Sequence, residues 1–139
     1  QGIYLKFAGG VITDYSALTG MPSLEKIIET DEGSRRLGEV AFGTNAGIKR
    51  VLKHPLFVEK VGGTMHIAIG QSYPECFVED PASPAGREEA DLLFKKGIIN
   101  RSARHVDIVI DFRPGGAGRR VFLDDRELKV RNGNWEIAG

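Results

Sequence analysis

The segment from His105 to Asp111 limits the fold more than any other, because every second residue in it is β-branched and apolar. Successive side chains of a β-strand point to opposite faces of the sheet. One face is then apolar and consists of Val106, Ile108 and Ile110. The other face carries His105, Asp107 and Asp111, with Val109 between the two carboxylates. We predict a strand that presents an imidazole and a carboxylate two positions apart on its polar face.

Two further segments follow the same alternation. In Thr64–Ile69, His66 shares a face with Thr64 and Ala68, whose small side chains leave space around the imidazole. In Leu37–Phe42, Glu39 interrupts an apolar strand from which it could point inward. A buried carboxylate is costly without a partner, so Glu39 needs a cation. The candidates are Arg35, Arg36 or a metal ion.

The remaining segments are interpreted as structural elements that carry no candidate site residue. Alternation on both sides of Gly9-Gly10 predicts a hairpin, and apolar residues after Pro22 predict a helix that ends near Gly33. Further along, we expect a short helix at Pro55–Val61, a loop at Pro74–Gly86, a helix at Arg87–Lys96, a turn at Gly115–Gly118 and a meander from Val121 to Ile137. The sequence therefore predicts one α+β domain over residues 1–139, with a mixed, largely antiparallel sheet of barrel-like character and two or three short helices.

Charge and composition exclude several classes of partner. The chain has 19 basic and 19 acidic residues, so no net charge attracts it to nucleic acid or to a membrane surface. No apolar run approaches the roughly 18 residues of a membrane span, and the start lacks the layout of a secretory signal. The lone Cys76 agrees with a reducing compartment. We expect a cytoplasmic protein, and because it opens with Gln1 we expect it to be part of a longer chain.

Imidazole and carboxylate side chains are the types that hold divalent transition metals. His66, His105, Asp107 and Glu39 are therefore candidate ligands, although each could be a satisfied polar residue or, for Glu39, an edge residue or ion-pair partner. His54 is interpreted as a surface residue, and no base that would activate Cys76 is evident. The nucleophile elbow, the phosphate-binding glycine loop, the paired-cysteine zinc motif and the helical H-E-x-x-H motif do not occur.

Six blocks of sequence, taken in order, match a known family. They are Ile3–Phe7 with Asp14–Ala17, Thr30–Ala41, Gly43–Asn45, His66–Gly70 with Tyr73 and Pro74, Asn100–Asp107, and Arg131–Trp135. The chain resembles the C-terminal part of the thermophilic metalloprotease family, the metallo-aminopeptidases of the aminopeptidase T and aminopeptidase S type. The resemblance spans nearly the whole chain.

The resemblance implies a metal-dependent hydrolase that carries two neighbouring divalent cations, Zn, Co or Mn. By motif, Glu39 resembles a metal-bridging carboxylate, and His66, His105 and Asp107 resemble further ligands. Tyr73 resembles the catalytic tyrosine, which with Glu39 makes the expected catalytic pair. Such an enzyme removes the N-terminal residue from a peptide with a free N-terminus.

The resemblance also implies that part of the site lies elsewhere. The family takes one more carboxylate from the polypeptide that precedes this region, and an N-terminal domain forms a wall of the substrate pocket. We therefore expect the isolated chain to have little or no activity, with its own N-terminal domain as a partner and a homodimer as the full-length assembly.

Two other interpretations remain open. His66, His105 and Asp107 also match the two-histidine, one-carboxylate set of non-haem Fe(II) oxygenases, and relatives that open hydroxylated pyridine rings resemble this scaffold. Glu39, Tyr73 and the block around Arg35–Glu39 favour the peptidase. The third interpretation is a folded assembly module that binds no metal.

Overall fold

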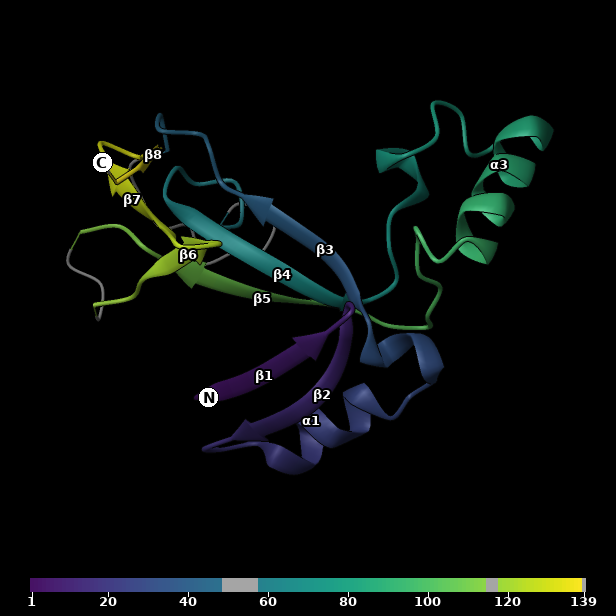
Figure 1. Cartoon of the computed structure of the whole chain (residues 1–139), viewed down its shortest axis with the longest axis horizontal. Helices are drawn as coiled ribbons and strands as arrows, with labels where there is room; N and C mark the ends of the chain where they lie inside the picture. Colours follow the sequence, from purple (N-terminus) through teal and green to yellow (C-terminus); the bar gives the residue numbers. More distant parts are fainter. Residues whose placement is uncertain (49–57, 115–117, 139) are drawn as a thin grey trace. The chain divides into compact units, whose positions relative to one another are not determined.

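The structure is a computed structural model, and it describes residues 1–48, 58–114 and 118–138. The chain divides into two units, one made of Gln1–Glu39 and Ala68–Asp107 and the other of Val40–Ile67 and Ile108–Gly139. Three strands, β3 (Leu37–Phe42), β4 (Thr64–Gly70) and β5 (His105–Asp111), form a sheet in the order β3-β4-β5 (Figure 1). The sequence-predicted bounds of all three strands are confirmed to within one residue.

Backbone hydrogen bonds at both ends of β4 show that its two neighbours run antiparallel to it. Against β3, the N–H of Gly43 donates to the carbonyl oxygen of Thr64, and the N–H of Gly70 donates to the carbonyl oxygen of Arg36. Against β5, the N–H of Phe112 donates to Gly63 and that of Gln71 donates to Arg104. In both pairs the start of one strand meets the end of the other, which is the antiparallel arrangement.

The first unit begins with the predicted hairpin, β1 (Ile3–Ala8) paired antiparallel with β2 (Val11–Ala17). Gly9 and Gly10 form its turn at φ 56° and 77°, a region that favours glycine. The helix α1 (Met21–Ile28) buries Leu24 and Ile28 in a cluster with Ile12 and Ile69. This cluster is the larger core of the unit.

The prediction that this helix ends near Gly33 is wrong, because α1 stops at Ile28. Asp31 is extended, and its side chain accepts the N–H of Ser34, which starts the short 3₁₀ helix η1 (Glu32–Arg35). Gly33 lies inside η1, where a Cβ would meet the carbonyl oxygen of Arg101 at 1.8 Å. Close approach of two backbones, and not helix termination, is the reason for this glycine.

The second helix of the first unit, α3 (Pro84–Lys95), begins three residues earlier than predicted. Ser83 accepts the N–H of Gly86 as its N-cap, and Pro84 fits the first turn, where no backbone donor is needed. The helix packs Ala90 and Leu93 against a small cluster that contains Val78 and Ile99. Before it, the predicted loop contains only one 3₁₀ turn, η2 (Pro74–Cys76).

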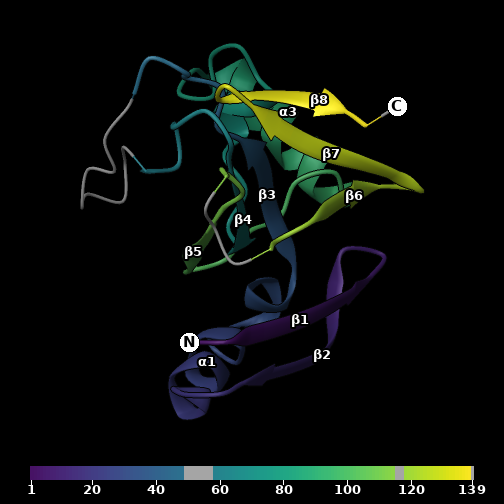
Figure 2. The same ribbon diagram turned by 90° about the vertical axis from the view of Figure 1, so that its left-hand side faces the viewer.

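The second unit contains the predicted meander, formed by β6 (Val121–Leu123), β7 (Arg126–Arg131) and β8 (Asn134–Ile137) in antiparallel order (Figure 2). Trp135 packs edge-on against Phe42 and Phe112, and its indole N–H donates to the carbonyl oxygen of Gly43 at 3.0 Å. The partly buried indole N–H thus keeps a hydrogen-bond acceptor.

The α+β class and the antiparallel sheets are confirmed, but the barrel-like character is not. In the parts of the chain that the structure describes, the strands form separate sheets of two, three and three strands. His54, the start of the predicted helix at Pro55–Val61 and most of the predicted turn at Gly115–Gly118 lie outside the described residues. Within residues 1–48, 58–114 and 118–138, no helix is long and apolar enough to cross a membrane.

Candidate metal centre

The ring of His105, at the start of β5, is held at both of its nitrogens. Its Nδ1 lies 2.7 Å from the backbone carbonyl oxygen of Gln71. A carbonyl oxygen only accepts, so Nδ1 carries the hydrogen and, in the neutral ring, Nε2 carries the lone pair. Nε2 lies 3.2 Å from Oδ1 of Asp107 and 3.6 Å from Oε2 of Glu39. The lone pair and the two carboxylates thus converge on one point, an arrangement suited to a shared cation.

The strands explain why these groups meet. Asp107 follows His105 by two residues on β5, so both side chains leave the same face. Glu39 comes from β3, and its side chain is 26% exposed against 16% for that of His105. Arg35, one of the cations considered for Glu39, lies 3.5 Å from Glu29. One contact that the structure gives Glu39 is with the imidazole of His105.

His66, on β4, completes the set of candidate ligands. Its side chain is buried, and Glu39, His66 and Asp107 each offer a ligand atom within 4.8 Å of the other two. Carboxylate oxygens and imidazole nitrogens bind zinc at about 2.0–2.2 Å, so two ligands on opposite sides of one ion lie about 4.4 Å apart. The donor types fit a divalent transition metal, and the 4.8 Å limit is close to, though slightly wider than, the span of a single ion.

Tyr73 follows β4 and lies beside the same imidazole. The centroid of its ring is 4.4 Å from that of His105, with 47° between the planes. The residue is 46% exposed. A phenol in this position is accessible to a molecule that approaches His105 from solvent.

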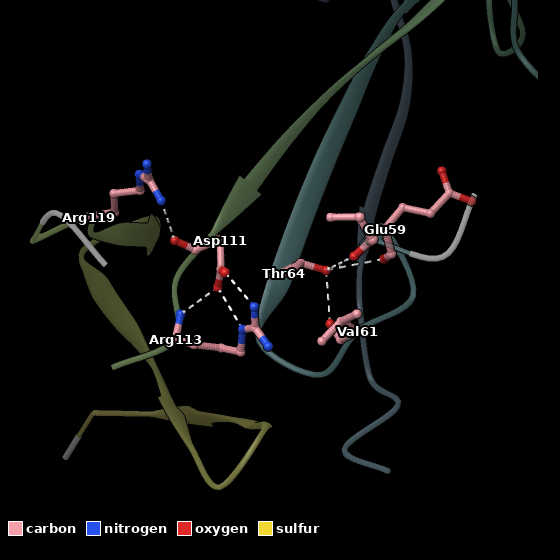
Figure 3. Close-up of polar contacts among 7 residues, drawn as sticks. Glu59, Val61, Thr64, Asp111, Arg113 and Arg119 are labelled. Carbon is pink, nitrogen blue, oxygen red and sulfur yellow. Dashed lines mark hydrogen bonds and ion pairs between the residues drawn. The ribbon is translucent and has the colours of Figure 1, made fainter. Parts of the chain in front are cut away.

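Asp111, which shares the polar face of β5 in the sequence pattern, has a different role. Its carboxylate accepts hydrogen bonds from the backbone and the guanidinium of Arg113, and Arg119 donates to its backbone carbonyl (Figure 3). The Arg113 side chain lowers the pKa of Asp111. Thr64, at the start of β4, directs its hydroxyl to backbone carbonyls, that of Val61 at 2.8 Å (Figure 3). Both residues stabilise the local backbone.

Two residues around His105 were not singled out as site residues from the sequence. One is Gln71, whose backbone holds the ring, and the other is Asp31, whose carboxylate accepts the N–H of Ala103 at 2.7 Å. This N–H, with further donors from Ser102 and Ser34, lowers the pKa of Asp31 from 3.8 to about 2. The Asp-x-x-Ser spacing of residues 31–34 is a capping signal that could have indicated a local role for Asp31.

A sequence profile of the thermophilic metalloprotease (M29) family matches residues 1–135. Aminopeptidase 2 of Geobacillus stearothermophilus is 34% identical over an alignment of 139 positions that covers 97% of this chain and 32% of that protein. Aminopeptidase AmpS of Bacillus subtilis (strain 168) is 36% identical with the same coverage of both chains.

A solved structure, wild-type AmpT from Thermus thermophilus, superimposes with a TM-score of 0.57 at 28% identity. The match covers 97% of this chain and 32% of that one. The chain therefore spans about a third of the length of the relatives it matches.

Proposed function

This chain belongs to the thermophilic metalloprotease (M29) family, and from that premise we propose that it is the C-terminal, metal-binding part of a metal-dependent aminopeptidase. The substrate is a peptide with a free N-terminus, and the reaction is hydrolysis of its first peptide bond. The observation that carries the proposal is the orientation of His105, whose Nε2 faces Asp107 and Glu39 while Nδ1 is committed to Gln71.

The donor set assigns a role to each residue. Glu39 would serve as the carboxylate shared by two divalent cations, Zn, Co or Mn, and His66, His105 and Asp107 would supply the remaining ligands of this chain. Ligating histidines usually donate their second ring N–H to a carbonyl or carboxylate, and the bond from His105 Nδ1 to Gln71 is of this kind. When bound, the cations supply Lewis acidity that activates water and polarises the scissile carbonyl.

Tyr73 takes the second catalytic role beside Glu39. Its ring lies against His105, and nearly half of the residue is exposed. A phenolic O–H there can donate to the oxygen of the scissile carbonyl as negative charge develops on it. Because Tyr73 is outside the ligand set, its contribution is expected in the rate of the reaction and not in metal affinity.

The isolated chain is proposed to bind metal weakly and to have little or no activity. It covers 32% of the relatives, and the resemblance implies a further carboxylate in the polypeptide that precedes this region. Affinity falls with the number of ligands, and a pocket without its N-terminal wall cannot orient a peptide. The N-terminal domain is thus the proposed partner within the full protein. The homodimer and the cytoplasmic location stay predictions.

The test uses the full-length protein. Loaded with Co²⁺ or Zn²⁺, it is expected to cleave leucine anilides and dipeptides, and His105→Ala is expected to abolish this activity. Failure to cleave, together with oxygen consumption in the presence of Fe(II) and a dihydroxypyridine, would replace the peptidase with the ring-cleaving dioxygenase. For the chain alone, calorimetric titration with Zn²⁺ decides the third alternative, since an intact fold without any binding identifies an assembly module.

A further inference from the structure

Three consecutive backbone amides lead into His105, and each of them donates to a side-chain oxygen. The N–H of Ser102 donates to Oε1 of Gln71 at 2.9 Å and that of Ala103 to Oδ2 of Asp31 at 2.7 Å. The N–H of Arg104 donates to Oγ of Ser102 at 3.0 Å. The path of the backbone into β5 is thus determined by side chains before the strand begins.

Asp31 is the residue that joins this segment to the rest of the unit. Its second oxygen, Oδ1, accepts the N–H and the hydroxyl of Ser34 at 2.8 and 2.9 Å and the hydroxyl of Ser102 at 2.9 Å. One carboxylate therefore accepts four donors, two from η1 and two from the segment before His105. Ser34 is fully buried, so this end of the connection is rigid.

The connection continues directly to the imidazole. The backbone N–H of Gln71 donates to the carbonyl of Arg104 at 2.6 Å, and its own carbonyl accepts His105 Nδ1 at 2.7 Å. The side chain of Gln71 meanwhile accepts the N–H of Ser102. A shift of the Ser102–Arg104 backbone would therefore move both the ring and the carbonyl that determines its tautomer.

Neighbouring groups leave the segment little freedom. Nδ2 of the buried Asn100 donates to the carbonyls of Gly33 and Gly70 at 2.7 and 2.6 Å. A Cβ on Gly33 would overlap the carbonyl of Arg101, so η1 and this segment pack backbone to backbone. Dense packing of this kind is what holds a functional side chain in one orientation.

We propose that Asp31 is a positioning residue for His105, holding the imidazole with Nδ1 on Gln71 and Nε2 toward Glu39 and Asp107. The inference rests on the proposed function in one respect, namely that the His105 imidazole is a ligand of a divalent metal. It also gives a physical role to the first parts of two matching blocks, residues 30–34 and 100–104, which contain none of the proposed ligands.

The substitution Asp31→Asn tests the proposal, because an amide cannot replace this carboxylate. All four partners of Asp31 donate hydrogen bonds. An asparagine has one acceptor oxygen and an NH₂ group that donates, so either the N–H of Ala103 or the three donors at Oδ1 would face another donor. The matched control is Asp91→Asn, which removes an equal charge from a carboxylate that pairs with Arg101 but accepts none of the three amides.

The first readout is the tautomer of the neutral His105 ring in the metal-free chain, measured at about pH 9, where an imidazole is ordinarily neutral, by long-range ¹H–¹⁵N NMR correlations of the ring. In the wild-type chain and in Asp91→Asn, we expect the hydrogen on Nδ1. In Asp31→Asn we expect it to be shared between the two nitrogens. The second readout is the dissociation constant for Zn²⁺, which we expect to rise about tenfold in Asp31→Asn and to stay unchanged in the control.

The milder variant Ser102→Ala removes the acceptor for the N–H of Arg104 and one donor to Asp31. We expect smaller changes in the tautomer population of His105 and in the dissociation constant for Zn²⁺, in the same direction as in Asp31→Asn. The proposal is overturned if Asp31→Asn folds and keeps the wild-type tautomer and the wild-type affinity for Zn²⁺. It is also overturned if both Asp31→Asn and Ser102→Ala unfold, because Asp31 would then be a general fold residue. If the wild-type chain binds no Zn²⁺, the proposed function fails, whereas the tautomer measurement still decides the role of Asp31.

Discussion

The Nε2 atom of His105 lies 3.2 Å from Oδ1 of Asp107, two residues further along the same strand. Because the opposite ring nitrogen is bonded to a backbone carbonyl, rotation of the imidazole away from the carboxylate would break a hydrogen bond. Glu39 faces the same nitrogen from a different strand. The cluster is thus arranged to receive a cation, and the predictions below follow from this arrangement and its surroundings.

Metal ions should stabilise the folded chain through Glu39. A ligand that binds only the folded state at 100 times its dissociation constant adds about 2.7 kcal/mol to the free energy of unfolding. We expect Zn²⁺ to raise the melting temperature of the wild-type chain and of Glu75→Gln, an exposed control. In Glu39→Gln the rise should be largely lost, as thermal unfolding with and without Zn²⁺ would show. Equal stabilisation of both variants would remove Glu39 from the ligand set.

Two aspartates of β5 should respond in opposite ways to the same substitution. Asp107→Asn should weaken Zn²⁺ binding and leave the stability of the metal-free chain almost unchanged. Asp111→Asn should retain binding but lose about 0.5–1 kcal/mol of stability, the usual value of a partly exposed ion pair, because Arg113 loses its partner. Calorimetry and urea unfolding of each variant measure the two quantities. Loss of binding in Asp111→Asn would contradict the assignment.

Acid should weaken the hydrogen bonds that the Asp31 carboxylate accepts. Its pKa is lowered from 3.8 to about 2 in the folded chain, so the unfolded chain takes up the proton first. The stabilisation is therefore complete above 3.8 and is lost as the pH falls toward 2. Denaturant midpoints at a series of pH values should show that the wild-type chain is more stable than Asp31→Asn above this window and that the difference in stability disappears within it. An advantage that stays constant across the window would argue against a charged Asp31.

Gly33→Ala should destabilise the first unit strongly. The added methyl group would lie 1.8 Å from the carbonyl oxygen of Arg101, and this clash cannot be relieved without moving the backbone. Overpacking of this kind costs about 1–3 kcal/mol, and the hydrogen bonds around Asp31 would weaken with it. In the control Gly47→Ala, the nearest atom is a side-chain oxygen at 3.1 Å, and urea unfolding should show a smaller change.

Tyr73→Phe should separate catalysis from metal binding. In the full-length enzyme we expect kcat to fall about 100-fold, the usual effect of removing one donor to a developing oxyanion. The dissociation constant for the metal should not change, since the phenol is not a ligand. Steady-state kinetics and calorimetry on the same preparation test both expectations. A parallel loss of metal affinity would instead make Tyr73 part of the metal-binding set.

Much of the fold follows from local rules. Alternation in Thr64–Ile69 and His105–Asp111 predicted two strands of the central sheet, and Gly9-Gly10 predicted the first hairpin, because strand periodicity and turn geometry depend on adjacent residues. The helix ends were less predictable. Gly33 looked like a helix terminator, yet α1 stops at Ile28 because Asp31 caps a new turn that contacts a segment about 70 residues away.

The sequence by itself determined which side chains share a strand face, and so it placed His105, Asp107 and Asp111 together as candidates. Only the tertiary structure decided that Glu39, from another strand, meets the imidazole that Asp107 also faces, while Asp111 pairs with Arg113. It likewise decided that the carbonyl of Gln71 selects the tautomer of His105. The physical reason is range: side-chain direction along a strand is a property of neighbouring residues, whereas a hydrogen bond depends on which distant segment the folded backbone brings within 3 Å.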